Sequence, residues 1–416
     1  MRAMKDSGIP WIGEIPKDWN CSKTKFFTRI SSGDGISNEE LQDGGEYEVL
    51  GGGSGIMGYH NNYNIDGDNL IIGRVGACGY VKRTNGKRYV SDNALIMRIT
   101  SNTLLFNYLY YVLTSAELSR LNTSTAQPLI TATKVYNVSI PIPSYAEQQR
   151  IAEFLDRKCA EVDEMIALQE QIIEELKAYK QSVITEAVTK GLNPDVPMKD
   201  SGSLWIGEIP TNWNLTRIGD VGEYKKGPFG SAITLDMFVP KGEHTIKVYE
   251  QQNAIKKDWT LGYYYLPVDY FESCLKGFEV LPNDIIVSCA GTIGEVYQLP
   301  MEVERGIINQ ALMRMRINST INLSYFLYIF DLILKREAER SSNGTAIKNI
   351  PPFSIFKKIL VPLPSLEEQQ KIADYLDEKC ADIDSLIQTK QSKIDSLKEY
   401  KKSIIYEYVT GKREVE

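Results

Sequence analysis

A duplicated helical stretch constrains this chain more than any other feature of its sequence. The segment from Pro143 to Thr189 reappears from Pro364 to Thr410, shifted by 221 residues. In each copy apolar residues recur every three or four positions, and neither proline nor glycine interrupts the run. Each copy is therefore predicted to form one long helix with a coiled-coil seam. The predicted seam residues are Leu155, Cys159, Val162, Ile166, Ile173, Leu176, Val183 and Ala187, and then Leu376, Cys380, Ile383, Ile387, Ile394, Leu397, Ile404 and Tyr408.

Both helices have a predicted start signal. Ser144 and Ser365 are N-cap residues, and a glutamate follows each of them three positions later, which is the pattern of a capping box. Lysines at positions 180 and 401 interrupt the two seams at equivalent places, as polar residues that fix register often do. Some 40 helical residues make a rod of roughly 60 Å, long enough to act as a spacer.

Each predicted seam can pair either with a helix of a second chain or with the other long helix of the same chain. A helix of this kind commonly forms an intermolecular dimer. One chain that carries two copies of the same seam can also pair them with each other, and the duplication favours this internal pairing.

A second duplication has a different offset. The motifs M-K-D-S-G at Met4 and W-I-G-E-I-P at Trp11 reappear 194 residues later, and Trp19 and Trp213 follow the two copies. We call these stretches the lead-in segments. Because the offset grows from 194 to 221, the second region between lead-in segment and helix is longer by 27 residues. The chain is therefore two halves, each with a lead-in segment, a globular domain and a long helix.

The two globular regions have the pattern of short strands separated by glycine turns, followed by one helix. In the first region strands are predicted at 47–50, 69–72, 80–81, 89–90 and 94–97, with a helix at 104–121. In the second, strands are predicted at 284–287 and 311–317, with a helix near 324–340. Residues 75–79 resemble 290–294, and residues 93–95 resemble 310–312, so the two regions are predicted to share a fold and to differ in surface.

The predicted fold class is α+β: two globular domains joined by two long antiparallel coiled-coil helices, with internal pseudo-two-fold symmetry. If that symmetry holds, Met1 should lie near the end of the second helix. The only plausible hinge is the stretch G-L-N-P-D-V-P at 191–197. The predicted boundaries are 1–19 for the first lead-in segment, 20–143 for the first domain, 144–191 for the first helix, 192–213 for linker and second lead-in segment, 214–364 for the second domain and 365–411 for the second helix.

Charge and composition limit the function classes. The net charge is −7, and nearly all of the excess acid lies in the two helical segments. An acidic rod between near-neutral domains permits nucleic-acid binding on local basic patches. The sequence has no run of about 18 apolar residues and no apolar signal core, so a cytoplasmic protein without membrane contact is expected. The six cysteines form no C-x-x-C pair and are expected to be reduced.

The two W-I-G-E-I-P segments and the two copies of P-x-P-S-x-x-E-Q-Q-[RK]-I-A-x-[FY]-L-D closely resemble the specificity subunit of type I restriction-modification systems. The resemblance covers essentially the whole chain. It implies that the globular regions are target recognition domains, each reading one half of a split, asymmetric site in double-stranded DNA. It further implies that the helices set the spacer and dock two modification (methyltransferase) subunits, and that restriction subunits can join them.

Motifs for catalysis are incomplete in this chain. The run G-G-G-S-G at 51–55 lacks the Gly-Lys-Ser/Thr of a phosphate loop. The stretch N-I-P-P-F at 349–353 has an isoleucine inserted into the N-P-P-[YF] pattern of adenine methyltransferases, and no F-x-G-x-G turn precedes it. The only histidines, His60 and His244, lie in different domains. A non-catalytic subunit without cofactor or metal is predicted.

Base reading needs arginine or lysine for guanine and amides for adenine, while hydroxyls bind phosphates. These residue types gather in loops of both domains. The predicted DNA-binding residues are Asn61, Asn62, Tyr63, Arg74, Lys82, Arg83, Thr125 and Gln127 in the first domain, and Lys225, Lys226, Ser231, Lys247, Tyr249, Gln252, Asn253, Thr345 and Lys348 in the second.

Two other functions stay open on the residues alone. One is a free-standing bipartite DNA-binding protein, and the other is a self-contained DNA-modifying enzyme. The missing cofactor and metal motifs argue against the enzyme. A neighbouring gene that encodes N-P-P-F and a cofactor turn would favour the subunit over the free-standing protein.

Overall fold

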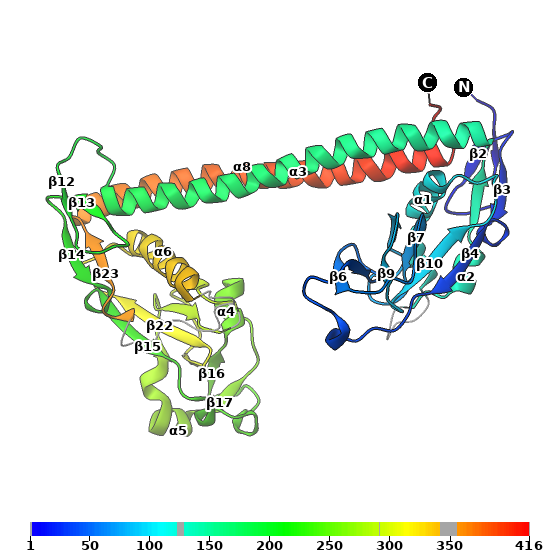
Figure 1. Cartoon of the computed structure of the whole chain (residues 1–416). Coiled ribbons are helices and arrows are strands. Elements are labelled where there is room, and N and C mark those ends of the chain that lie inside the picture. The colour runs from blue at the N-terminus through cyan, green and yellow to red at the C-terminus, as the bar shows by residue number, and fades with distance from the viewer. Residues whose placement is uncertain (1, 123–128, 291, 342–355, 416) are drawn as a thin grey trace. The chain divides into compact units, whose positions relative to one another are not determined.

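The computed structural model describes residues 2–122, 129–290, 292–341 and 356–415, and for residues 334–341 it describes the backbone alone. The chain divides into two compact units. The first unit joins Met1–Ile173 to Thr389–Glu416, and the second unit is Glu174–Gln388. Each unit therefore contains one globular domain together with part of each long helix (Figure 1).

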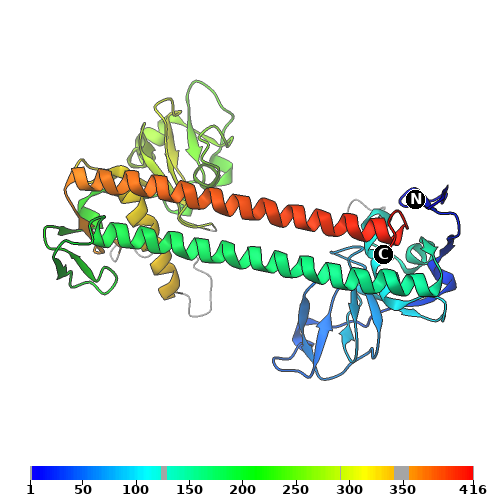
Figure 2. The ribbon, with the colours of Figure 1, turned by 90° about the horizontal axis from the view of Figure 1, so that it is seen from above.

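The two predicted long helices are confirmed. Helix α3 (Tyr145–Lys190) has 46 residues and helix α8 (Leu366–Val409) has 44. The N-caps are also confirmed, because the hydroxyls of Ser144 and Ser365 accept hydrogen bonds from the backbone N–H three residues later, at 3.3 and 3.2 Å. Both views of the ribbon show α3 and α8 running side by side (Figures 1 and 2).

One half of the predicted capping box is wrong. The carboxylate of Glu147 does not return to the backbone of Ser144. It accepts hydrogen bonds from Trp19 Nε1 at 2.9 Å and from the guanidinium of Arg2. A buried indole and an arginine offer this carboxylate stronger partners than an N-cap amide does. Glu147 thereby ties the lead-in segment to the start of α3.

In the first unit the N-terminal part of α3 packs against the C-terminal part of α8. Leu155 and Cys159 share a buried core with Ile404, Ile405 and Tyr408. This pairing within one chain is antiparallel, as predicted from the duplicated seam.

The second unit contains the same packing with the roles of the helices exchanged. Ile184 and Val188 near the end of α3 share a core with Ile372, Leu376 and Cys380 near the start of α8. Across both units the predicted seam residues are buried, apart from three that are half-buried, namely Leu176, Val183 and Ile387.

The lysines that interrupt the seams pair across the helices. In the first unit Lys401 Nζ lies 2.7 Å from Asp163 Oδ1, and in the second unit Lys180 Nζ lies 2.7 Å from Asp384 Oδ1. The two aspartates are mostly exposed, so each pair contributes at most about 1 kcal/mol to stability. Their value lies in fixing the register of the helices.

Each lead-in segment forms a two-stranded hairpin with the same register. Strands β1 (Met4–Asp6) and β2 (Glu14–Pro16) pair as do β12 (Met198–Asp200) and β13 (Glu208–Pro210). In the first unit this hairpin meets the end of α8, where Tyr406 Oη donates a hydrogen bond to Ile12 O at 3.0 Å. The described part of the first lead-in segment therefore lies at the end of the second helix, as predicted, while Met1 itself is outside the described residues.

Gly411 makes that close approach possible. Its φ is +70°, which glycine adopts without strain. A Cβ at this position would lie 2.6 Å from Pro16 and 2.9 Å from the ring of Trp19. Any larger residue would push the lead-in segment away from the end of α8.

The first globular domain is built on an antiparallel sheet of order β4-β10-β7-β8, and a smaller sheet of order β6-β5-β9 packs beside it (Figure 1). Strand β11 (Ser139–Ile142) returns to pair with β3 (Asn20–Lys23). The other strands are β4 (Thr28–Ser32), β5 (Tyr47–Leu50), β6 (Ile56–His60), β7 (Asn69–Gly73), β8 (Val81–Thr84), β9 (Tyr89–Val90) and β10 (Ala94–Ile99), and the helices are α1 (Phe106–Ser115) and α2 (Ala132–Tyr136).

The second domain repeats this plan, which confirms the predicted shared fold. Its main sheet has the order β15-β22-β19-β20, and β23 (Leu360–Leu363) pairs with β14 (Asn214–Arg217). A second sheet, β17-β16-β21-β18, and helices α4 and α5 enlarge this domain. The bounds are β15 (Gly222–Lys226), β16 (Thr245–Tyr249), β17 (Tyr265–Pro267), β18 (Glu279–Val280), β19 (Ile285–Ser288), β20 (Val296–Gln298), β21 (Gly306–Ile308), β22 (Leu312–Ile317), α4 (Gln251–Lys256), α5 (Val268–Tyr270) and α6 (Leu323–Ser341).

A buried glutamine at the start of each long helix holds the neighbouring domain. Gln148 Oε1 accepts a hydrogen bond from Leu105 N at 2.8 Å, and Gln148 Nε2 donates to Pro143 O at 3.0 Å. In the second unit Gln369 bonds in the same way to Asn322 N and Pro364 O, at 2.6 and 2.9 Å.

A buried tyrosine completes each of these junctions. Tyr108 Oη lies 3.1 Å from Pro141 O and 3.3 Å from Val409 O, so its hydroxyl joins helix α1, strand β11 and the end of α8. Tyr325 of α6 makes the equivalent contacts with Pro362 O and Val188 O, both at 3.3 Å. Burial raises the pKa of both tyrosines well above its ordinary value, so both stay neutral donors.

Among the described residues, no helix is long and apolar enough to cross a membrane.

We expect Tyr108→Phe to lower the free energy of unfolding by about 1–2 kcal/mol, because two buried carbonyls lose their shared donor. Denaturant unfolding of the whole chain measures this. Tyr110→Phe is the matched control, since the Tyr110 hydroxyl forms no hydrogen bond within the described chain. Equal stability of the two variants would contradict a structural role for the Tyr108 hydroxyl.

Candidate nucleic-acid interface

The loop after β6 presents the clearest group of predicted contacts in the first domain. Asn61, Asn62 and Tyr63 are all exposed. The ring of Tyr63 meets the ring of Tyr47 edge-on at 5.2 Å, and Lys87 Nζ lies 4.5 Å from its centre. The amides and the aromatic ring of this loop, together with Lys87 from the turn between β8 and β9, are groups that can contact bases and phosphates.

The basic residues on β8 and at the end of β7 have internal partners. Lys82 Nζ donates to Gly53 O at 2.7 Å, and burial lowers the pKa of this lysine. The glycine run of residues 51–55 therefore turns a carbonyl toward a cation, which is the opposite of a phosphate-binding loop. Arg74 is half-buried, and its Nη1 lies 3.3 Å from Ser32 Oγ.

Arg83 is placed differently from the prediction. Its Nη1 lies 2.6 Å from Asp156 Oδ1 on α3, and its guanidinium lies 5.0 Å from the ring centre of Tyr110. This side chain holds the first domain against the helix. A guanidinium engaged in this way is a poor candidate for a base contact.

Four predicted residues of the second domain are exposed. Lys225 and Lys226 lie on β15, and Ser231 follows in the next turn. Gln252 stands at the start of α4, with its Nε2 3.0 Å from Glu250 Oε2. These side chains keep donors or acceptors available to DNA.

Three other predicted contacts in this domain are buried, and the prediction for them is corrected. Lys247 is 1% exposed and its Nζ donates to Trp259 O at 2.6 Å. Tyr249 is fully buried and donates to Glu304 O at 2.6 Å. Asn253 caps α4 from the interior, with its side-chain oxygen 2.8 Å from Glu250 N. Lys247 and Tyr249 are buried because β16 is an inner strand between β17 and β21. Asn253 lies in α4, and its side-chain nitrogen donates to Asp258 O and Leu261 O, both at 2.9 Å.

The remaining predicted contacts, Thr125, Gln127, Thr345 and Lys348, lie outside the described residues.

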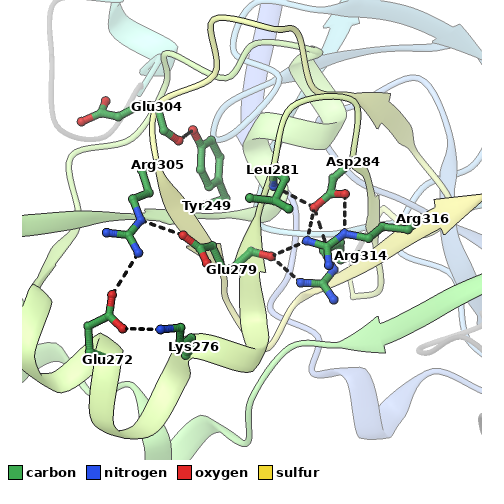
Figure 3. A network of polar contacts seen from close by, with 10 residues as sticks. All are labelled: Tyr249, Glu272, Lys276, Glu279, Leu281, Asp284, Glu304, Arg305, Arg314 and Arg316. Atoms are coloured by element: carbon green, nitrogen blue, oxygen red, sulfur yellow. Dashed lines mark hydrogen bonds and ion pairs between the residues drawn. The ribbon is translucent and has the colours of Figure 1, made fainter.

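Sequence analysis missed an arginine pair in the second domain, in which Arg314 is buried and Arg316 is half-buried (Figure 3). Arg314 and Arg316 point from the same face of β22. Arg316 binds Asp284 through two hydrogen bonds of 2.7 and 2.9 Å, and Arg314 donates to Glu279 O in β18. Glu279 also accepts from Arg305 Nε at 2.7 Å.

The hydrogen bonds from Arg314 and Arg316 to Glu279 O join the two sheets of the domain, which have separate backbone hydrogen-bond networks. Burial lowers the pKa of Arg314, whereas the hydrogen bond to Asp284 raises that of Arg316. The signal in the sequence was the alternation M-R-M-R within a strand, which places two arginines on one face.

No group of three or more histidine, cysteine, aspartate or glutamate side chains is positioned for a metal ion in the part of the chain that the structure describes. The six cysteines are all free.

The halves of the chain match one family model. Residues 16–178 and residues 210–399 each match the type I restriction modification DNA specificity domain. The chain belongs to this family. The two matches begin and end near equivalent points, in the lead-in segments and the long helices, so the duplication is a duplication of the specificity domain.

Curated specificity subunits align with this chain, one along nearly its whole length and another along a shorter, more similar stretch. The type I restriction enzyme MjaVIII specificity subunit of Methanocaldococcus jannaschii is 24% identical over 420 residues, covering 96% of this chain and 93% of that protein. The StySPI specificity subunit of Salmonella potsdam is 43% identical over 82 residues, covering 20% and 16%.

A solved structure supports the same fold. A chain from a study of complex assembly and conformational transition of the type I restriction-modification system aligns with a TM-score of 0.65 at 15% identity. The alignment covers 95% of this chain and 98% of that chain.

Lys247→Ala should lower the free energy of unfolding by about 1–3 kcal/mol, because the carbonyl of the half-buried Trp259 loses its donor. Gln252→Ala should change it by less than about 0.5 kcal/mol, as for most exposed substitutions. Denaturant unfolding distinguishes the two. Altered DNA base preference of Lys247→Ala at unchanged stability would show that the lysine contacts DNA after all.

Proposed function

We propose that this chain is the DNA-recognition subunit of a type I restriction-modification complex. Each globular domain reads one half of a bipartite, asymmetric site in double-stranded DNA, and α3 and α8 set the spacer between the halves. The helices dock modification subunits, two per chain, and restriction subunits join the assembly. The chain itself is not catalytic.

The main support for this proposal is that two dissimilar globular domains are attached to the long helices through repeated junctions. The junctions around Gln148 and Gln369 repeat closely, whereas the second domain carries a second four-stranded sheet where the first has three strands. Two different readers on one repeated framework suit an interrupted site with unlike halves. Exposed groups available for reading, such as Asn61 and Tyr63 or Lys226 and Gln252, are present on both domains.

Two other functions fit less well. A self-contained DNA-modifying enzyme needs a cofactor or metal site, for which the described residues offer no metal-binding group and the sequence no complete motif. A free-standing DNA-binding protein fits the domains, but membership in the specificity family favours a subunit of a larger complex.

The purified chain alone should neither methylate nor cleave DNA. With the modification subunit of its own system it should confer adenine methylation at one interrupted sequence, which genome-wide mapping of methylated adenines would reveal. Methylation by the lone chain with S-adenosylmethionine, surviving stringent purification, would overturn the proposal.

The spacer role of the helices has a separate test. Two ion pairs link α3 to α8. Residue 171 on α3 and residue 392 on α8 each lie midway between these two pairs. A heptad inserted after each keeps the seams in phase and lengthens the pair by about 10 Å. The gap between methylated half-sites should then widen by at most about three base pairs while the half-sites stay the same. An unchanged gap would show that the helices do not set the spacing.

A further inference from the structure

The two helix–domain junctions differ at one carboxylate. In the first unit Asp156 accepts three hydrogen bonds: from Arg83 at 2.6 Å, from Tyr111 at 2.7 Å and from Asn107 at 2.9 Å. The guanidinium of Arg83 also lies over the rings of Tyr110 and Tyr111. This carboxylate of α3 is therefore neutralised by a cation of the first domain.

Asp377 is the equivalent carboxylate of the second unit. Tyr328, the counterpart of Tyr111, donates to its Oδ1 at 2.7 Å. The equivalence is secure because Tyr325 and Gln369 repeat the contacts of their counterparts in the first unit. Among the described residues, no counterpart of the other two donors bonds to Asp377.

The residues that replace the two missing donors can be identified in the sequence. Ser324 stands where the first unit has Asn107, one position before the buried tyrosine of the helix, and it forms no hydrogen bond to Asp377. Gln298 stands where the first unit has Arg83. Strand pairing shows this, since Arg83 lies opposite Leu70 in the first domain and Gln298 lies opposite Ile285 in the second. Among the described residues, Tyr328 is the one hydrogen-bond partner of Asp377.

A cavity of about 890 Å³ opens at this place, between α6 and the two long helices of the second unit. Apolar side chains of Ile184, Leu327 and Ile387 line part of it. It also contains the acids Glu174, Asp331, Asp377 and Asp384 and the bases Lys177 and Lys180.

Most of these charges already have partners. Lys177 pairs with Glu174 at 2.8 Å, and Lys180 pairs with Asp384 at 2.7 Å. Asp331 is engaged as well. Asp377, held by a single neutral hydroxyl, is the carboxylate whose charge no described cation meets.

We propose that this cavity receives the side chain of an arginine or lysine from a partner protein. The cationic head takes the place that Arg83 occupies in the first unit, against Asp377 and Tyr328. The aliphatic stem lies along the apolar wall, as long cationic side chains do on mixed surfaces. Excess carboxylate excludes DNA as the occupant, because phosphates would be repelled.

The partner is the modification subunit, an assignment that rests on the proposed function. In the first junction Arg83 of this chain neutralises Asp156, whereas in the second no described cation neutralises Asp377. The two modification subunits therefore contact different sites. A charge-assisted contact strengthens binding at the second junction alone.

The test measures binding of the modification subunit to the full chain by titration calorimetry. Asp377→Asn should weaken one class of sites by about tenfold or more and reduce its dependence on salt. Asp156→Asn is the matched control, because its cation comes from the same chain, and it should lower the melting temperature without changing affinity. Glu378→Gln controls for net charge. Unchanged affinity of Asp377→Asn would overturn the inference and leave the proposed function standing.

A second variant fills the cavity from within. Gln298→Arg combined with Ser324→Asn transplants the donors of Asp156, and it should weaken partner binding by a similar factor while raising the melting temperature. Unaltered partner affinity in this variant, or neutralisation of Asp377 by a lysine or arginine of this chain in a crystal structure of the complex, would refute a partner-supplied cation. Failure of the wild-type chain to bind any modification subunit would overturn both the proposed function and this inference.

Discussion

The structure depends on how each globular domain is fixed to both long helices at once. Gln148 and Gln369 are fully buried and hydrogen-bond the backbone at the start of the neighbouring helix, while Tyr108 and Tyr325 reach the end of the opposite one. A buried amide or hydroxyl left without a partner costs about 1–3 kcal/mol. Each junction therefore forms only when domain, helix start and helix end are in place together.

The packing around these junctions is apolar and continuous. In each unit a single core takes in the main sheet, the domain helix, the tryptophan of the lead-in segment and the paired ends of α3 and α8. The domain and its helix ends thus share one hydrophobic core. By contrast, the second sheet of the larger domain has one apolar cluster of its own and shares another with Ile286 and Leu312 of the main sheet. Hydrogen bonds from Arg314 and Arg316 to Glu279 O also join the two sheets.

The repeated framework was predictable from the sequence because it leaves periodic signals. The 3-4 spacing of apolar residues predicted both helices, and the W-I-G-E-I-P repeats indicated two equivalent lead-in segments, although not that each forms a hairpin. Most strands with a continuous apolar run, such as β7, β10 and β22, were predicted within a few residues. Strand β6 was missed because its sequence, I-M-G-Y-H, shows no clear alternation of apolar and polar residues.

The candidate site was less predictable, since residue type does not reveal burial or partners. Lys247 and Arg83 have the chemistry of DNA contacts, yet one lies inside the domain and the other binds Asp156. Their flanking residues offered a partial signal, because Lys247 sits in the apolar run I-K-V-Y. The partner of Arg83 comes from a helix 73 residues away, and no local pattern encodes such a contact.

The buried glutamines and tyrosines of the junctions bond to main-chain groups. The carbonyls of Pro141, Val409, Pro362 and Val188 accept hydrogen bonds, and the amides of Leu105 and Asn322 donate them. Main-chain groups are present whatever side chains surround them. A domain with an unrelated surface can dock on this framework if it supplies one tyrosine and a matching backbone path. Recombination between genes that share the framework can then exchange whole domains, so new specificities can arise in single steps without a period of misfolding.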